Sequence, residues 1–285
     1  MNDVEKFWSK HIVNEIEFRT PKLSLEYLNW RAEQYPKFME LMELYGNHKD
    51  EMILDYGCGP GNDLVGFLVY SSIKRIYGID VSRKALELAQ TRLNLHKIGK
   101  DYYLLCLVLD SIPEIPLVDG CVDYIYSEGV LHHTSHPQEI LKEFYRVLKF
   151  GGECCIMVYN RDSIWYHLYV PYVLRLVRKQ FLTLTDDEAF AKSTDSDECP
   201  ISRNYAPEDF MLMCRMAGFK TEFKGGYYSD FELGIYRKYY ELAKVADITQ
   251  EHKDFLSELT LKDGFYPTYR GKYAGVGGVY KLIKE

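Results

Sequence analysis

The sequence contains no long hydrophobic run. Its most apolar segment, residues 164–177, reads "IWYHLYVPYVLRLV" and is interrupted by His167, Pro171 and Arg175. A membrane-spanning helix needs about 20 consecutive, predominantly apolar residues. The start, "MNDVEKFWSKH", is polar and is not followed by the apolar region of a secretory signal. We therefore expect no transmembrane segment and a cytoplasmic location.

An excess of basic residues is also missing. The chain of 285 residues contains 35 Lys and Arg against 42 Asp and Glu, so its formal net charge is −7. Proteins that bind nucleic acid neutralise phosphates with a broad basic surface. The charge balance therefore argues against a nucleic-acid partner, and it leaves the oligomeric state open.

The seven cysteines lack the spacing of a disulfide framework or a zinc site. No two of them form a C-x-x-C pair, and no secretory signal accompanies them. Cys154 and Cys155 are adjacent in a predicted strand, where neighbouring side chains point to opposite faces and do not easily hold one metal ion. Free cysteines usually behave as small buried hydrophobic residues. We therefore expect reduced thiols and no metal site.

Glycine is concentrated in the segment "ILDYGCGPGND", residues 53–63. Gly57, Gly59 and Gly61 stand at alternate positions, which suits a turn that needs positive φ angles or lets another molecule approach the backbone. The apolar run before this turn is typical of a buried strand, and "NDLVGFLVYS" after it has helical spacing. Strand, tight turn and helix in this order open a nucleotide-binding α/β unit.

Strand and helix patterns alternate after this unit. Further strands are predicted at "IKRIYGID", "YYLLCLVLD", "CVDYIYSEG", "ECCIMVYN", "KTEFKGG" and "AGVGGVYKLIKE". Helices are predicted from the N-cap Ser82 through "RKALELAQTRLNL", from Pro137 to the pair Gly151 and Gly152, and at "APEDFMLMCRMAGF". This order predicts an α/β fold with a mostly parallel sheet that helices cover on both faces.

Three segments fall outside the alternation and are rich in aromatic residues. Residues 1–50 are expected to form an N-terminal helical cap with a short helix at "PKFMELMELYG". We expect residues 51–285 to form one α/β domain with cap insertions at about 161–204 and 226–270. The first insertion should contain a tyrosine-rich helix that breaks near Pro171 and then a mobile acidic loop, "TDDEAFAKSTDSDECP". The caps should close over the carboxyl edge of the sheet.

Acidic residues follow the predicted strands at positions that an adenosine-containing cofactor requires. Asp80 ends the second strand, where a carboxylate can accept hydrogen bonds from both ribose hydroxyl groups. Asp110 follows the third strand, where an acidic side chain can bind an adenine amino group; a helix cap or an exposed loop residue is the alternative. "YSEGVLHH" follows the fourth strand at the same edge of the sheet.

Four segments, "ILDYGCGPGNDL", "IYGIDVSRKALELAQTRL", "VDGCVDYIYSEGVLHH" and "EILKEFYRVLKFGG", resemble in order and spacing the class I S-adenosylmethionine-dependent methyltransferases. The resemblance covers about residues 51–159 closely and 205–224 loosely. It implies a Rossmann-like, seven-stranded fold with helical cap insertions and S-adenosylmethionine as the cofactor. The segment "DSIPEIPLVDG" is one residue longer than the usual loop of the family, which leaves the adenine contacts open.

The resemblance also implies which residues bind the cofactor. Asp55 and the glycine turn correspond to positions that hold its methionine part, and Asp80 corresponds to the position that binds ribose. The residues after the third strand correspond to the adenine contacts, and those that end the fourth strand would line the methyl-donor side. The implied set is Asp55, Gly57, Cys58, Gly59, Gly61, Asp80, Val81, Asp110, Ser111, Ile112, Ser127 and Glu128.

The sequence argues against two related functions, dinucleotide binding and methylation of a nucleic-acid amino group. The dinucleotide fingerprint needs a third glycine three residues after the second, where this chain has Asn62. S-adenosylmethionine has no pyrophosphate, so its site does not need a free helix N-terminus for phosphate. Methylation of a nucleic-acid amino group would call for an Asn/Asp-Pro-Pro-aromatic motif after the fourth strand, where this chain reads "SEGV".

The acceptor side of the site is less defined. His132 and His133 follow the fourth strand and titrate near neutral pH, so either can remove a proton from a hydroxyl or amine acceptor. A hydrogen bond to the backbone of their own loop is the structural alternative, and a thiolate or free amine needs no base. Many of the 25 tyrosines lie in the caps, where they can enclose an aromatic or apolar acceptor or form a small core.

The sequence thus predicts methyl transfer from S-adenosylmethionine to an O, N or S atom of a small-molecule acceptor. Two alternatives stay open. One is a lipid- or quinone-modifying methyltransferase at a membrane surface, because "YVLRLVRK" is amphipathic and basic. The other is a cofactor-binding protein without transfer activity.

Overall fold

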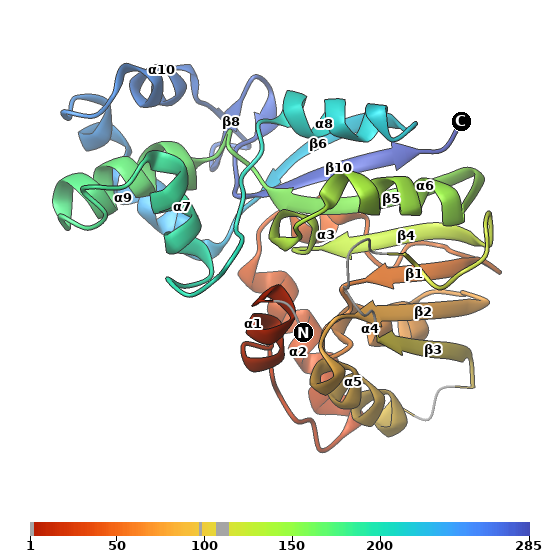
Figure 1. Cartoon of the computed structure of the whole chain (residues 1–285). Helices are drawn as coiled ribbons and strands as arrows, with labels where there is room; N and C mark the ends of the chain where they lie inside the picture. The colour runs from red at the N-terminus through yellow and green to blue at the C-terminus, as the bar shows by residue number, and fades with distance from the viewer. Residues whose placement is uncertain (1–2, 97–98, 107–113) are drawn as a thin grey trace.

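A seven-stranded sheet forms the centre of the chain in the computed structural model, which describes residues 3–96, 99–106 and 114–285 (Figure 1). The strands are β1 (Met52–Tyr56), β2 (Arg75–Asp80), β3 (Asp101–Cys106), β4 (Val122–Glu128), β5 (Leu148–Tyr159), β6 (Lys220–Tyr227) and β10 (Gly277–Ile283). They lie in the order β3-β2-β1-β4-β5-β10-β6. Neighbours from β3 to β5 are parallel, and β10 is antiparallel to β5 and β6. The predicted α/β, Rossmann-like, seven-stranded and mostly parallel sheet is confirmed.

Both faces of the sheet are buried at its central strands, where alternate residues join different apolar clusters. In β5, Cys155 and Met157 belong to one cluster, whereas Cys154 and Ile156 belong to the other. The helices that pack on the sheet are α4 (Asn62–Tyr70) and α5 (Arg83–His96) in the first cluster, and α6 (Pro137–Val147) and α8 (Pro207–Met216) in the second. Burial on two faces explains why the strands read as continuous apolar runs.

The predicted helix limits are correct at one helix and wrong at another. Ser82 caps α5 as expected, since its Oγ accepts a hydrogen bond of 3.2 Å from the backbone N–H of Ala85. Helix α6, in contrast, ends at Val147 and not at the two glycines. Leu148 already has extended backbone angles and begins β5, so Gly151, at a φ of 77°, lies within the strand.

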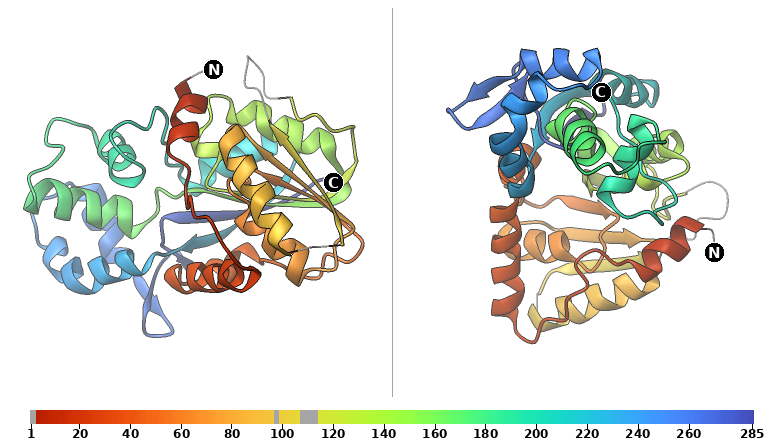
Figure 2. Two further views of the ribbon diagram at one scale, coloured as in Figure 1. Left: turned by 90° about the horizontal axis from the view of Figure 1, so that it is seen from below. Right: turned by 90° about the vertical axis from the view of Figure 1, so that its left-hand side faces the viewer.

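Three helices precede the first strand: α1 (Asp3–Lys10), α2 (Pro21–Gln34) and α3 (Phe38–Met42). Thr20 caps α2 by accepting a hydrogen bond from the N–H of Leu23, and Pro21 occupies the first helical position. The helix expected at "PKFMELMELYG" is confined to α3, because Lys37 and Glu43 on either side have left-handed backbone angles. In the right-hand view of Figure 2, the link between α1 and α2 crosses in front of the carboxyl ends of the parallel strands.

The two insertions form a layer beyond the carboxyl edge of the sheet (Figure 1). Their helices are η2 (Trp165–Val177), α7 (Asp186–Thr194), α9 (Asp230–Lys244) and α10 (Gln250–Glu258). A small antiparallel sheet, made of β7 (Thr260–Lys262), β8 (Tyr266–Tyr269) and β9 (Lys272–Tyr273), follows them. Helices η2, α7, α9 and α10 pack against one another, with η2 in the middle.

The expected break at Pro171 is wrong, because η2 continues through this residue. Helix η2 is a π-helix, in which each N–H group bonds to the carbonyl five residues back. In an α-helix the proline ring would clash with the carbonyl of residue i−4, and the wider turn of the π-helix leaves room for it. Although η2 contains the most apolar segment of the chain, no helix among the described residues has both the length and the apolar character needed to cross a bilayer.

The prediction of a mobile acidic loop at residues 185–200 is also wrong over most of that segment, because Asp186–Thr194 form α7. Thr185 and Glu188 form a reciprocal capping box, in which each side chain accepts a hydrogen bond from the other residue's backbone N–H. Asp186 and Asp187 lie in the first turn, where negative charge stabilises the helix dipole. The acidic composition therefore marks a helix start in this segment.

Candidate active site

A cavity of about 540 Å³ lies at the carboxyl ends of β1, β2 and β4. Its walls come from the glycine turn and from all three cap segments. The lining residues used below are Trp8, Arg31, Tyr35, Asp55, Gly57, Cys58, Gly59, Asp63, Asp80, Val81, Glu128, His133, Tyr159, Trp165, Asp195, Tyr227 and Phe231. Its size suits a small molecule or cofactor, and its position is the one at which parallel α/β sheets bind ligands.

The three glycines of the turn after β1 all have positive φ angles, but they differ in what a Cβ atom would contact at each position. A Cβ atom at Gly57 would lie 2.1 Å from Cγ2 of Val130, and one at Gly61 would lie 3.0 Å from Cβ of Ala89. These two glycines allow close packing within the protein. A Cβ atom at Gly59 would meet nothing within 4 Å, and Gly59 lines the cavity. The backbone of Gly59 is therefore free for close approach by a ligand.

Asp80 is fixed at the end of β2 by the backbone around it. Its carboxylate accepts hydrogen bonds from the N–H of Gly59 at 2.9 Å and from the N–H of Ser82 at 2.8 Å. Burial raises the pKa of Asp80, and these N–H groups oppose that effect by stabilising the charged form. A carboxylate can accept further hydrogen bonds, so the one that faces the cavity can also receive ligand hydroxyl groups.

Asp55, at the end of β1, carries an unsatisfied acceptor at the cavity. The residue is 2% exposed, and its Oδ2 has no hydrogen-bond partner among the described residues. Burial and the neighbouring carboxylates of Asp63 and Glu128 raise the pKa of Asp55 well above its ordinary value. Buried polar atoms are nearly always paired, so this atom fits a site that a cationic or hydrogen-bonding ligand completes.

Arg31, in α2, is a site residue that the sequence analysis missed. Its guanidinium binds Asp63 through two hydrogen bonds, of 2.5 and 3.2 Å, and lies 3.5 Å from Glu128. Tyrosine hydroxyl groups donate to the same acids: Tyr45 to Asp63, and Tyr126 and Tyr227 to Glu128. Nε of Arg31 is buried and unpartnered among the described residues. A carboxylate in the cavity could therefore use this donor.

The structure places only some of the other predicted cofactor residues at the cavity. Cys58, Val81 and Glu128 line the cavity, as do Asp55, Gly57, Gly59 and Asp80. Ser127 is fully buried, and its hydroxyl donates to the carbonyl of Tyr56 at 2.9 Å, which ties β4 to β1. Gly61 and Ser127 do not line the cavity. Asp110, Ser111 and Ile112 lie outside the described residues.

The two histidines after β4 have different surroundings. His132 is fully buried away from the cavity, and its ring packs at a tilt against Tyr159 with ring centroids 4.0 Å apart. Neither of its ring nitrogens has a partner among the described residues. His133 lines the cavity, and its Nδ1 lies 2.7 Å from the carbonyl oxygen of Ile201. A carbonyl only accepts, so this bond assigns the proton to Nδ1 and leaves Nε2 with a lone pair.

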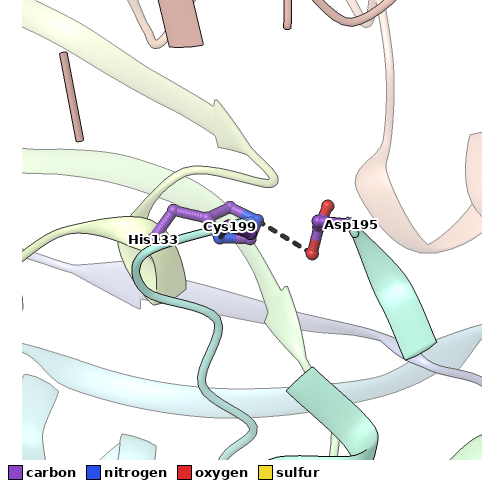
Figure 3. A group of neighbouring side chains, drawn as sticks. All are labelled: His133, Asp195 and Cys199. Atoms are coloured by element: carbon purple, nitrogen blue, oxygen red, sulfur yellow. Dashed lines mark hydrogen bonds and ion pairs between the residues drawn. The ribbon is translucent and has the colours of Figure 1, made fainter. Parts of the chain in front are cut away.

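Asp195 lies beside His133 at the end of α7 (Figure 3). Its Oδ2 is 3.6 Å from Nε2 of His133, and the carboxylate accepts hydrogen bonds from the hydroxyl groups of Tyr159 and Ser202. Burial lowers the pKa of His133, and the charge of Asp195 partly opposes that effect. His133 is therefore held near an acid that stabilises it once it accepts a proton.

Cys199 joins His133 and Asp195 in a group whose ligand atoms lie within 4.8 Å of one another. Its Sγ is 3.8 Å from Nδ1 of His133, the nitrogen that donates to Ile201. Burial raises the pKa of the Cys199 thiol to about 11. A zinc site needs a thiolate and an imidazole lone pair directed at the same point, and neither is arranged here.

The burial of His132 predicts how acid affects stability. Burial lowers its pKa well below the ordinary value, so the unfolded chain binds a proton that the folded chain does not. Its contribution to folding is present above about pH 6.5 and is lost as the pH falls below that value. Urea unfolding of the wild type and His132→Gln should show a wild-type advantage that shrinks by up to about 1.4 kcal/mol per pH unit below this point. An advantage that stays constant would contradict the assignment.

Comparison with known proteins identifies the family to which the chain belongs. Residues 47–208 match the model of a family described as a methyltransferase domain. An uncharacterized methyltransferase of Schizosaccharomyces pombe is 35% identical over 109 residues, which are 38% of this chain and 39% of the relative. The mitochondrial ubiquinone biosynthesis O-methyltransferase of Candida albicans is 30% identical over 134 residues, which are 46% of this chain and 40% of the relative. The chain thus spans less than half the length of these relatives.

A solved structure extends the likeness of the fold beyond the matched segment. The YcgJ protein of Bacillus subtilis superposes with a TM-score of 0.53 at 16% identity, over 86% of this chain and 97% of its own. The family match covers more than half of the chain and includes the glycine turn, β2, β4 and the histidine pair. The chain belongs to the class I S-adenosylmethionine-dependent methyltransferase family.

Proposed function

We propose that this chain transfers the methyl group of S-adenosylmethionine to an O, N or S atom of a small molecule bound under the caps. One observation carries the proposal. The unpaired Oδ2 of Asp55, the open backbone face at Gly59 and the carboxylate of Asp80 converge on a single cavity at the carboxyl edge of the sheet. These residues would bind the two polar parts of the cofactor, its amino-acid group and its ribose.

The residues present fit the cofactor. Its ammonium group would pair with Asp55, its carboxylate would accept from Nε of Arg31, and its ribose hydroxyl groups would donate to Asp80. When bound, the cofactor supplies a methyl group on a positively charged sulfur. Burial disfavours the charged form of the Asp55 carboxylate, and the ammonium group of the cofactor would stabilise that charged form.

The chain contributes alignment, exclusion of water and a base. Displacement needs the acceptor atom about 3 to 3.5 Å from the methyl carbon and in line with the bond that breaks. Residues of the caps line the rest of the cavity and would limit the access of water to the reacting atoms once both ligands are bound. Nε2 of His133 carries the lone pair that would take a proton from the acceptor, and Asp195 would stabilise the imidazolium that forms. His132 does not line the cavity, so we assign it a structural role.

The membrane-surface alternative has less support. Val173 and Leu174, two apolar residues of "YVLRLVRK", are buried within the cap, and Arg175 of the same segment pairs with Asp186. These three side chains are therefore not available to a lipid surface, and only the end of the segment, Val177 to Lys179, is exposed. A hydroquinone or phenol acceptor stays within the proposal, because His133 can deprotonate a hydroxyl group as well as an amine.

The glycine turn gives a test of the cofactor's position. Gly57→Ala forces a methyl group into Val130, so it should lower the free energy of unfolding by about 1 to 3 kcal/mol. Gly59→Ala points its methyl group into open cavity space and should cost stability only about 1 kcal/mol, through its φ of 50°. We expect Gly59→Ala to weaken the binding of S-adenosylhomocysteine strongly. Full affinity in this variant would place the ligand elsewhere.

The transfer itself is tested with S-adenosylmethionine that carries a trideuteromethyl group. The protein is incubated with a pool of small phenols, amines and thiols, and products are identified by mass spectrometry. We expect S-adenosylhomocysteine and one class of product that gains the labelled methyl group, and less of both with Asp80→Ala at a limiting concentration of S-adenosylmethionine. Binding of S-adenosylhomocysteine without any labelled product would favour the alternative of a cofactor-binding protein without transfer.

A further inference from the structure

The part of the cavity beyond the glycine turn is lined by aromatic rings from every cap segment. Trp8 comes from α1, Trp165 from η2 and Phe231 from α9. Tyr35 and Tyr227, whose ring centroids are 5.9 Å apart, and Tyr159 complete this wall. Aromatic faces carry a negative potential, so this wall favours an apolar body, a cation or both.

Charged residues of the cavity are mainly acidic. Among the described lining residues, Asp55, Asp63, Asp80, Glu128 and Asp195 are acids, and Arg31 is the single Lys or Arg. Arg31 already faces two of these acids, Asp63 and Glu128. Its remaining donor, Nε, is the one that we assign to the carboxylate of the cofactor, so the lining offers no further cation to an anionic acceptor such as a carboxylate or a phosphate ester.

Two of the acids stand at the aromatic wall and are each oriented by a tyrosine. The hydroxyl of Tyr159 donates to both oxygens of Asp195, at 3.0 and 3.1 Å, and the hydroxyl of Tyr227 donates to Glu128 at 3.0 Å. Ring faces and carboxylates held together in this way form a pocket that stabilises a positive charge. A phenol or a thiol gains nothing from such charge complementarity.

We infer that the acceptor is an amine, cationic in water, with an aromatic or apolar body, an inference that rests on the proposed function. The ammonium group binds between the aromatic wall and Asp195 and gives one proton to Nε2 of His133. The nitrogen lone pair so released forms the bond to the methyl carbon. The electrons of the broken C–S bond return to sulfur, so that the neutral thioether S-adenosylhomocysteine leaves and His133 later returns its proton to water.

Three probes of similar shape and different charge test this inference: phenethylamine, phenethyl alcohol and phenylacetate. Each is titrated into protein saturated with S-adenosylhomocysteine, and binding is followed by ligand-observed NMR. We expect phenethylamine to bind at least about tenfold more tightly than the other two, the scale of one charge-assisted hydrogen bond. Equal binding, tighter binding of the alcohol or the acid, or no binding of any probe would overturn the inference.

Variants at Asp195 separate charge recognition from a general loss of structure. Asp195→Asn should weaken phenethylamine binding by about tenfold and leave the affinity for S-adenosylhomocysteine unchanged. Asp197→Asn is the matched control, because Asp197 lies two residues further on, has a side chain 73% exposed and does not line the cavity. Equal effects of the two substitutions on phenethylamine would contradict the inference. Failure of S-adenosylhomocysteine to bind the wild type would contradict the proposed function instead.

Discussion

Replacing His133 with alanine should lower the turnover number roughly 10²- to 10⁴-fold, the usual contribution of a positioned general base. A protonated amine has no lone pair, and the lone pairs of a neutral hydroxyl group are weak nucleophiles until its proton leaves. His133 lines the cavity, and Nε2 is its unprotonated ring nitrogen. The variant should bind S-adenosylhomocysteine with the affinity of the wild type, because His133 is not among the residues proposed to hold the cofactor. Steady-state kinetics and calorimetry on the same preparation measure both quantities.

His132→Ala is the matched control for this experiment. His132 lies one residue away, packs against the rings of His133 and Tyr159, and does not line the cavity. Its loss should reduce the free energy of unfolding and have a much smaller effect on turnover than the loss of His133. If His133→Ala instead lowers cofactor affinity, stability and turnover together, His133 is a structural residue. If neither substitution changes turnover, the acceptor arrives without a proton to lose and catalysis rests on alignment.

Replacing Arg31 with methionine should destabilise the protein by about 3 to 5 kcal/mol, the typical cost of removing one partner of a buried ion pair. The Arg31 side chain is 9% exposed, and its removal leaves Asp63 and Glu128 facing each other and Asp55 without a cation. Methionine keeps most of the apolar part of the Arg31 side chain, so the loss of unfolding free energy reports the removal of the guanidinium charge. Urea unfolding at neutral pH measures the change.

Lys22→Met supplies the comparison on the same helix. Lys22 pairs with Glu26 in α2, but their side chains are 84% and 54% exposed, and surface pairs of this kind contribute at most about 1 kcal/mol. Adding Asp63→Asn to Arg31→Met should recover part of the lost stability, because one of the uncompensated acids is then neutral. Equal, small effects of the two single substitutions would show that Arg31 does not hold the acids of the cavity together.

The sequence was most informative where short-range patterns decide the structure. The apolar run before Asp55, the three glycines and the helix after Asn62 lie within about twenty residues, and each follows from local backbone or burial preferences. Asp80 was placed correctly because the end of a parallel strand is a fixed position in this kind of sheet. These features were sufficient to predict the sheet and the position of Asp55, Gly59 and Asp80 at the cavity.

Residues brought in from distant segments could not be found in this way. Arg31 and Asp195 belong to helical segments with no spacing that marks a site, and only the fold of the caps brings them to the cavity. The capping box at Thr185 and Glu188 was a usable signal for α7, and the acidic composition around it concealed the helix. Pro171 shows the opposite case, in which a strong local signal is overridden by a buried, wider helix.

Isothermal titration of S-adenosylhomocysteine into the wild type and Asp80→Ala tests the central claim most directly. The account predicts one binding site in the wild type and an affinity weaker by about 1 to 3 kcal/mol in the variant, the scale of charge-assisted hydrogen bonds. Nicotinamide adenine dinucleotide, titrated in parallel, should give no heat. The account is contradicted if the dinucleotide binds and S-adenosylhomocysteine does not.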